Sequence, residues 1–186
     1  PLDNAENKLI YALAFPSVEA RDAAWKAFFA DPVWQAAKKA SETNGPLVSK
    51  VESVLLAATD YSPIIEPAVA GDRIFELRTY TASAGNLGNI NARFRNHTCK
   101  LFEKHGITNV VYWNPLEGQP GAGETLVYLI SHKSVDAAAA SFAAFRADPA
   151  WLSVRAASEQ SAGGSLTVPN GVKSEYLQPT NYSPMR

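Results

Sequence analysis

The side chains best able to do chemistry gather between residues 74 and 113, which read as a strand, a helix and a second strand. They are Arg78, Tyr80, Arg93, His97, His105, Tyr112 and Trp113. Cationic, phenolic and imidazole groups can hold a polar ligand group or move a proton, and aromatic rings can hold an apolar body. A small-molecule site is therefore the first hypothesis for this stretch.

The strand at 74–80 alternates between two sets of side chains. One set is Phe75, Leu77 and Thr79, and the other is Glu76, Arg78 and Tyr80. Because successive side chains of a strand point to opposite faces, we expect the first set to face the helices and the second to face the other side. The neighbouring strands, at 110–113 and 126–130, are apolar on both sides, which indicates that the second face is covered too. The polar set would then line an enclosed space with aromatic walls; the alternative is a sheet with one wet face.

The helix expected at 87–106 carries two histidines. Its apolar stripe consists of Leu87, Ile90, Phe94 and Leu101, and His97 falls on that stripe. An imidazole placed there is either neutral and hydrogen-bonded in the core or directed into a cavity. His105 precedes Gly106, where the helix should end, which favours a capping role at the negative end of the helix dipole. The two histidines are eight residues apart, not four, so no metal or other cofactor is predicted.

Composition excludes several classes of function. The chain of 186 residues is 46% hydrophobic and 19% charged, which is typical of a globular protein. A net charge of -1 provides no field for gathering phosphates, so nucleic acid is not an expected partner. No apolar run is long enough to span a membrane. The single cysteine, Cys99, leaves the compartment open: the chain is soluble, and either cytoplasmic or exported after an N-terminal signal is removed.

The chain contains an internal repeat. A shift of 117 positions aligns residues 8–42 with 125–159 and gives 15 identities in 35 pairs. In each copy a strand, at 9–15 or 126–132, is followed by two helices. A serine begins the first helix, and an Asp-Pro pair begins the second. A last strand, at 51–56 or 172–177, closes each copy. Self-similarity of this extent indicates a duplicated domain.

The two copies are not equally complete. Residues 73–113 add a strand, a helix and a strand before the shared part of the second copy, which gives βαββαβ, the ferredoxin-like order of an α+β fold. We therefore predict half of a first repeat (βαβ) at 1–63, a linker at 64–72 and a complete domain at 73–186. In the complete order the opening strand lies between the third and the last, so the first copy lacks its central strand. We expect an N-terminal fragment, separated by cleavage, or a second subunit to supply it, since unpaired backbone is costly.

Several motifs, in order and spacing, resemble the NIPSNAP family. They are residues 75–80 (FELRTY), 93–98 (RFRNHT), 101–106 (LFEKHG), 125–128 (TLVY), 145–149 (FRADP) with Trp151, and the closing Tyr-Ser-Pro at 182–184. The resemblance implies a dimeric α+β barrel, in which two ferredoxin-like sheets pack face to face, and a homo-oligomer is expected. It also implies that His97, His105, Arg78 and Tyr80 belong to the family's motifs. The wider superfamily includes cofactor-free oxygenases, isomerases and haem enzymes.

Three functions compete. In the first, the barrel binds a small apolar molecule, with or without transforming it: Glu76 and Arg78 orient its polar group, and His97 or Tyr80 shuttles a proton. The apolar body would lie against Tyr112, Trp113 and Tyr128. In the second, the chain is a protein-interaction or scaffold module without catalysis. In the third, a histidine is the axial ligand of haem.

Overall fold

The computed structural model describes residues 1–65 and 73–185. The chain divides into two compact units, which we treat separately. The first, called here the complete domain, is formed by Pro1–Lys8 and Val54–Arg186. The second, called the half-repeat, is Leu9–Ser53. Residues 66–72, most of the predicted linker, and Arg186 lie outside the described part of the chain.

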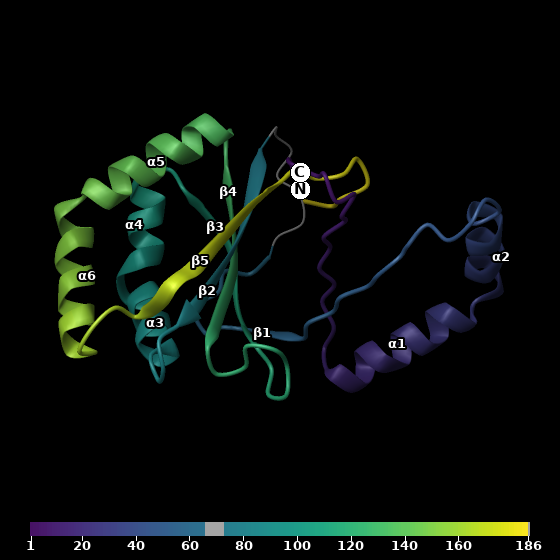
Figure 1. Cartoon of the computed structure of the whole chain (residues 1–186), viewed down its shortest axis with the longest axis horizontal. Helices are drawn as coiled ribbons and strands as arrows, with labels where there is room; N and C mark the ends of the chain where they lie inside the picture. Colours follow the sequence, from purple (N-terminus) through teal and green to yellow (C-terminus); the bar gives the residue numbers. More distant parts are fainter. Residues whose placement is uncertain (66–72, 186) are drawn as a thin grey trace. The chain divides into compact units, whose positions relative to one another are not determined.

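One antiparallel sheet organises the complete domain (Figure 1). Its strands are β1 (Leu56–Ala58), β2 (Ile74–Ala82), β3 (Thr108–Pro115), β4 (Thr125–His132) and β5 (Thr167–Leu177). Their order in the sheet is β1-β3-β4-β2-β5. The opening strand β2 lies between β4 and β5, as the ferredoxin-like order requires. The α+β class and the predicted βαββαβ order are confirmed.

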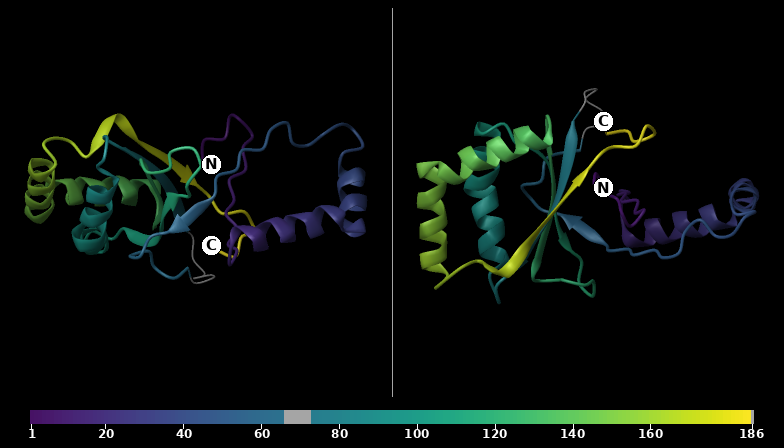
Figure 2. Two further views of the ribbon diagram at one scale, coloured as in Figure 1. Left: turned by 90° about the horizontal axis from the view of Figure 1, so that it is seen from below. Right: turned by 45° about the horizontal axis from the view of Figure 1, so that its top comes forward.

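Helices cover one face of this sheet, and the two views of Figure 2 show them on the same side. They are α3 (Leu87–Arg93), a π-helix η1 (Phe94–Thr98), α4 (Cys99–Lys104), α5 (Val135–Ala147) and α6 (Pro149–Ser161). Ser134 caps α5 by accepting from the amide of Ala137 at 3.1 Å, and Asp148 caps α6 through the amide of Ala150 at 2.8 Å. Between helices and sheet lies the main core, to which Phe94, Phe102 and Tyr128 belong.

The expected assignment of faces on β2 is wrong. Tyr80 packs against the main core below the helices, and the guanidinium carbon of Arg78 lies 4.7 Å from the ring centre of Phe142 on α5. The polar set therefore faces the helices. Phe75 lies on the other face, where it forms a second cluster with Val111 and Leu129. A period of two separates the faces of a strand without saying which one the helices cover, and here the face away from the helices is the more apolar.

The half-repeat contains two helices, α1 (Val18–Ala30) and α2 (Pro32–Ser41). Ser17 and Asp31 cap them as predicted. The strands expected at 9–15 and 51–56 do not form, except that Leu56 begins β1, which belongs to the complete domain and pairs with β3. Strands need neighbours for their backbone groups, and the strand that should lie between these two segments is not among the described elements of the half-repeat. Neither α1 nor α2 buries a side chain.

Candidate functional site

A buried carboxylate joins three strands on the helix-facing side of the sheet. Glu76 on β2 is only 1% exposed. It accepts hydrogen bonds from Arg78 on its own strand and from the hydroxyl of Ser174 on β5. Its second oxygen lies 2.9 Å from Nε2 of His132 on β4. We call Glu76, Arg78, His132 and Ser174 the carboxylate network.

The charge of Glu76 is stabilised inside the protein. Burial alone would raise the pKa of its carboxyl group, but the hydrogen bond from His132, the charge of Arg78 and the hydrogen bond from Ser174 together hold the pKa below its usual value. Glu76 is therefore a carboxylate at neutral pH. It balances the positive charge of Arg78, whose side chain is 14% exposed.

Arg78 connects the carboxylate to two tyrosines. Its Nε donates to the hydroxyl of Tyr128 at 2.8 Å, and a terminal nitrogen lies 3.4 Å from the hydroxyl of Tyr80. The Tyr128 ring stacks on Tyr112 with a centroid distance of 5.2 Å, and both rings are fully buried. Burial raises the pKa of both phenols, so they remain neutral donors or acceptors. Five of the predicted site residues are thus brought together: Glu76, Arg78, Tyr80, Tyr112 and Tyr128.

His132 is the member of the network that sequence reasoning missed. The sequence places it only at the end of the expected strand at 126–132. In the sheet it lies opposite Ile74, which makes it a diagonal, same-face neighbour of Glu76. Its Nε2 points at the carboxylate and so carries the proton, while the buried Nδ1 has no hydrogen-bond partner among the described residues. Strand register is the signal that would have found it.

Two predicted site residues lie elsewhere. Trp113 packs in the cluster on the opposite face of the sheet. His97 is exposed, so its expected place on the buried stripe is wrong. The cause is η1: the amide of Cys99 bonds to the carbonyl of Phe94, five residues back, and this wider turn buries Thr98 in place of His97.

The other basic residues of this stretch hold helices together. Arg93 is buried, with its guanidinium carbon 5.2 Å from the ring centre of Trp151 and a nitrogen 3.3 Å from the hydroxyl of Ser158, both on α6. His105 ends α4, and Gly106 follows with φ +74°, as the capping role predicts. Nε2 of His105 lies 2.7 Å from a carboxyl oxygen of Asp148. In two of the three histidines Nε2 is thus hydrogen-bonded to a carboxylate, which does not favour either of them as an axial ligand of haem.

Asp148 ties α4 to the start of α6. Hydrogen bonds from Lys104, from His105 and from the amide of Ala150 lower the pKa of its carboxyl group. Because the pKa of Asp148 is lowered in the folded state, its carboxylate stabilises the fold at pH values above the unfolded-state pKa of about 3.9. This contribution disappears as the pH falls through the folded-state pKa. We expect Asp148→Asn, which can still cap the helix, to lower the melting temperature of the complete domain at pH 7.

Thermal unfolding at pH 7 and at pH 3 measures this effect, and the difference between wild type and Asp148→Asn should shrink at pH 3. The matched control is Asp31→Asn, the repeat equivalent, which caps α2 at 2.7 Å from the amide of Val33. It should leave the melting of the complete domain unchanged. An equal loss at both pH values would contradict the electrostatic explanation.

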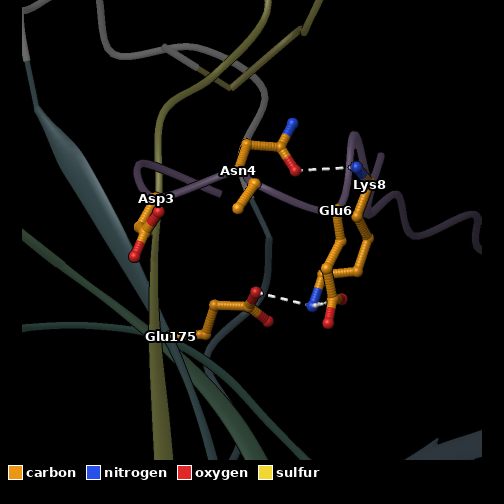
Figure 3. A pocket seen from close by; sticks show the side chains of 6 residues that line it. Asp3, Asn4, Glu6, Lys8 and Glu175 are labelled. Carbon is orange, nitrogen blue, oxygen red and sulfur yellow. Dashed lines mark hydrogen bonds and ion pairs between the residues drawn. The ribbon is translucent and has the colours of Figure 1, made fainter.

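A surface hollow lies away from the network, beside β5. It has a volume of about 250 Å³, and Figure 3 shows Asp3, Asn4, Glu6, Lys8 and Glu175 around it. Nζ of Lys8 lies 2.8 Å from the carboxylate of Glu175. Among the described residues, no cluster of three or more histidine, cysteine or acidic side chains is arranged to hold a metal ion. Within the same residues, no helix has the length and apolar character needed to cross a membrane.

The strand order and the single helix layer define a ferredoxin-like α+β domain. A family model for NIPSNAP matches residues 4–63 and 75–184. The chain therefore belongs to the NIPSNAP family.

Solved structures agree on the fold. A NIPSNAP family protein of unknown function from Agrobacterium tumefaciens is 20% identical; the match covers 64% of this chain and 98% of that one, with a TM-score of 0.51. A NIPSNAP-like domain protein from Burkholderia xenovorans is 18% identical over 62% of this chain and 91% of its own, also with a TM-score of 0.51. A comparison with curated protein sequences finds no match. At these identities the likeness shows the fold alone.

Proposed function

We propose that the complete domain binds a small, largely apolar molecule with one uncharged hydrogen-bonding group on the helix-facing side of its sheet. One observation supports this most: a buried carboxylate–guanidinium pair, Glu76 and Arg78, stands inside an aromatic layer. Replacing such a pair with apolar side chains is often neutral or stabilising, so packing alone gives little reason for it. Buried, mutually perturbed charges are instead typical of functional sites.

The charges of the network indicate which ligand group suits it. Glu76 and Arg78 neutralise each other, and the donors of Arg78 are directed at Glu76, Tyr128 and Tyr80. No net charge remains to attract an ion. A hydroxyl or carbonyl group of a neutral ligand needs only one partner, and the half-buried phenol of Tyr80 can both donate and accept.

Tyr80 is also the residue placed to move a proton. Its ring packs on Phe94 and Tyr128 at 5.7 and 5.3 Å, which would hold an aromatic ligand body next to the hydroxyl. Arg78 and the carboxylate network would position this phenol and orient the ligand group. Tyr112 and Tyr128 would form the wall behind it. Trp113 and His97 have no part in this proposal, because they lie on another face and in solvent.

A matched pair of probes tests the proposal. We expect 2-naphthol, followed by its fluorescence on titration with the protein, to bind about tenfold or more tightly than 2-methylnaphthalene. The reason is that the hydroxyl satisfies a partner that the methyl group would leave unpaired, at roughly 1–3 kcal/mol. Tyr80→Phe should abolish this preference.

The control is Tyr182→Phe, since Tyr182 is 72% exposed. It should leave both affinities unchanged. Equal binding of the two probes by the wild type, or a preference that survives in Tyr80→Phe, would contradict the proposal.

A second candidate, the interaction module, is favoured by a separate observation. Residues 9–53 expose large apolar side chains, among them Leu9, Tyr11, Leu13 and Phe29.

A further inference from the structure

One buried charge of the complete domain has no counter-charge. Among the described residues, three acidic, lysine or arginine side chains are buried: Glu76, Asp148 and Arg93, with exposed fractions of 1%, 6% and 7%. Glu76 is paired with Arg78, and Asp148 with Lys104. Arg93, at the end of α3, forms an ion pair with none of the described residues. Burying a charge is expensive unless a partner compensates it, so Arg93 is the exception that needs a reason.

The guanidinium of Arg93 also keeps one edge open for hydrogen bonding. Its Nη1 lies 3.3 Å from the hydroxyl of Ser158 on α6, which is the one hydrogen bond that the side chain makes to a described residue. Nε is buried, and no described residue accepts from it. Nε and Nη2 form the side of a guanidinium on which two parallel N–H groups can hold both oxygens of a carboxylate. The open edge is therefore the edge suited to an anion.

The neighbours of Arg93 do not supply that anion. The ring centre of Trp151 lies 5.2 Å from the guanidinium carbon, and this cation–π attraction offsets only part of the cost of burial. Glu159 on α6 acts on Arg93 electrostatically, but its Oε1 accepts a hydrogen bond from Nε of Arg155 at 3.0 Å. Because the charges of Glu159 and Arg155 act on Arg93 in opposite directions, the positive charge of Arg93 remains.

This charge cannot be lost by deprotonation. Burial lowers the pKa of the Arg93 guanidinium, yet an arginine side chain stays protonated in proteins. A methionine at this position could also fill the space between α3 and α6 and contact Trp151 without burying a charge. Packing alone therefore gives little reason for an arginine, and a buried donor without an acceptor is rare enough in proteins to require an explanation.

We propose that Arg93 is the centre of an anion site between α3 and α6 that binds the carboxylate of a small, apolar organic acid. Nε and Nη2 of Arg93 hold the two carboxylate oxygens. One uncompensated positive charge with one planar pair of donors matches a singly charged, planar carboxylate better than a doubly charged phosphate or sulfate. The half-buried ring of Trp151, at the margin of the main core, favours an apolar body on the acid.

This site goes beyond the function proposed above and does not depend on it. The carboxylate network is neutral and takes an uncharged group, whereas Arg93 takes an anion. Arg93 keeps 7% of its surface exposed, so the guanidinium lies close below the protein surface. The carboxylate reaches Nε by displacing the side chains that cover this edge.

Isothermal titration calorimetry of the full chain at pH 7 tests the site with benzoate, and benzamide is the matched uncharged probe. We expect one benzoate per chain, bound at least tenfold more tightly than benzamide, because only the carboxylate balances the buried charge. Arg93→Met should abolish this preference. Its melting temperature should be higher than that of the wild type or within about 2 °C of it, since an uncompensated charge is replaced by an apolar side chain.

Three further variants locate the site. Arg95→Met removes an arginine that already donates two hydrogen bonds to Asp60, at 2.8 and 2.5 Å, and should leave benzoate binding unchanged. Glu159→Gln removes the negative charge that acts on Arg93 and should tighten benzoate binding about threefold. Tyr80→Phe, which tests the 2-naphthol site, should leave the preference for benzoate in place.

Three results would overturn the anion site. The first is equal binding of benzoate and benzamide by the wild type. The second is a preference for benzoate that persists in Arg93→Met or disappears in Arg95→Met. The third is a clear fall in the melting temperature of Arg93→Met, which would show that Arg93 serves the packing of α3 against α6.

Discussion

Replacing Glu76 with leucine is expected to destabilise the complete domain by about 3–5 kcal/mol, since it leaves Arg78 buried without its counter-charge. Ser174 and His132 would also lose the acceptor of their hydrogen bonds. Denaturant unfolding, followed by the amide protection of β2 and β4, measures the loss. The double variant Glu76→Leu, Arg78→Met removes both charges and should regain at least half of it.

The double variant also separates stability from function. If the ion pair serves the fold alone, restoring stability with apolar side chains should cost nothing else. Under the proposed function the stable double variant instead loses its preference for 2-naphthol, because Tyr80 no longer has Arg78 beside it. A loss below about 1 kcal/mol in Glu76→Leu would mean that Arg78 finds water or another partner, and would speak against an enclosed site.

Phe145→Ala and Phe28→Ala are expected to differ widely although they remove the same ring from the same repeat position. Phe145 contacts Phe102 and Trp151 with centroid distances of 4.9 and 4.5 Å, so its loss opens a cavity worth about 3–5 kcal/mol. Phe28 keeps only the rings of its own unit, including Trp34 at 4.5 Å, and its loss should cost about 1 kcal/mol or less.

Amide hydrogen exchange measures this pair of variants, because it reports the stability of the two units separately. The amides of α5 and β4 are followed for Phe145→Ala, and those of α1 for Phe28→Ala. Equal costs would show that the half-repeat already has a buried core.

Much of the complete domain could be predicted from its residues. The alternation along residues 74–80, the serine and Asp-Pro caps of the paired helices and the repeat itself led to the strand order with β2 between β4 and β5. These signals are local, or they compare the chain with itself, so they do not depend on how the layers pack.

The errors arose where packing decides. Alternation could not tell which face of β2 the helices cover, and so Glu76, Arg78 and Tyr80 were placed on the wrong side. The π-helical turn at 94–98 moved His97 into solvent. A count based on the regular helical period of 3.6 residues cannot predict such a wider turn. His132 was missed because its partner Glu76 lies on another strand, 56 residues away. The strands at 9–15 and 51–56 were expected from composition, but a strand needs a neighbour to bond to.

The short strand β1 has a consequence for how this chain behaves in solution. Leu56, Ala57 and Ala58 pair with the outer side of β3, and the amide of Leu116 extends the contact by donating to the carbonyl of Leu55 at 3.0 Å. Without this segment, β3 would present a row of unsatisfied amides and carbonyls, a template on which further molecules can stack into fibrils. The three residues of β1 thus cover the open edge of β3 and protect it against aggregation.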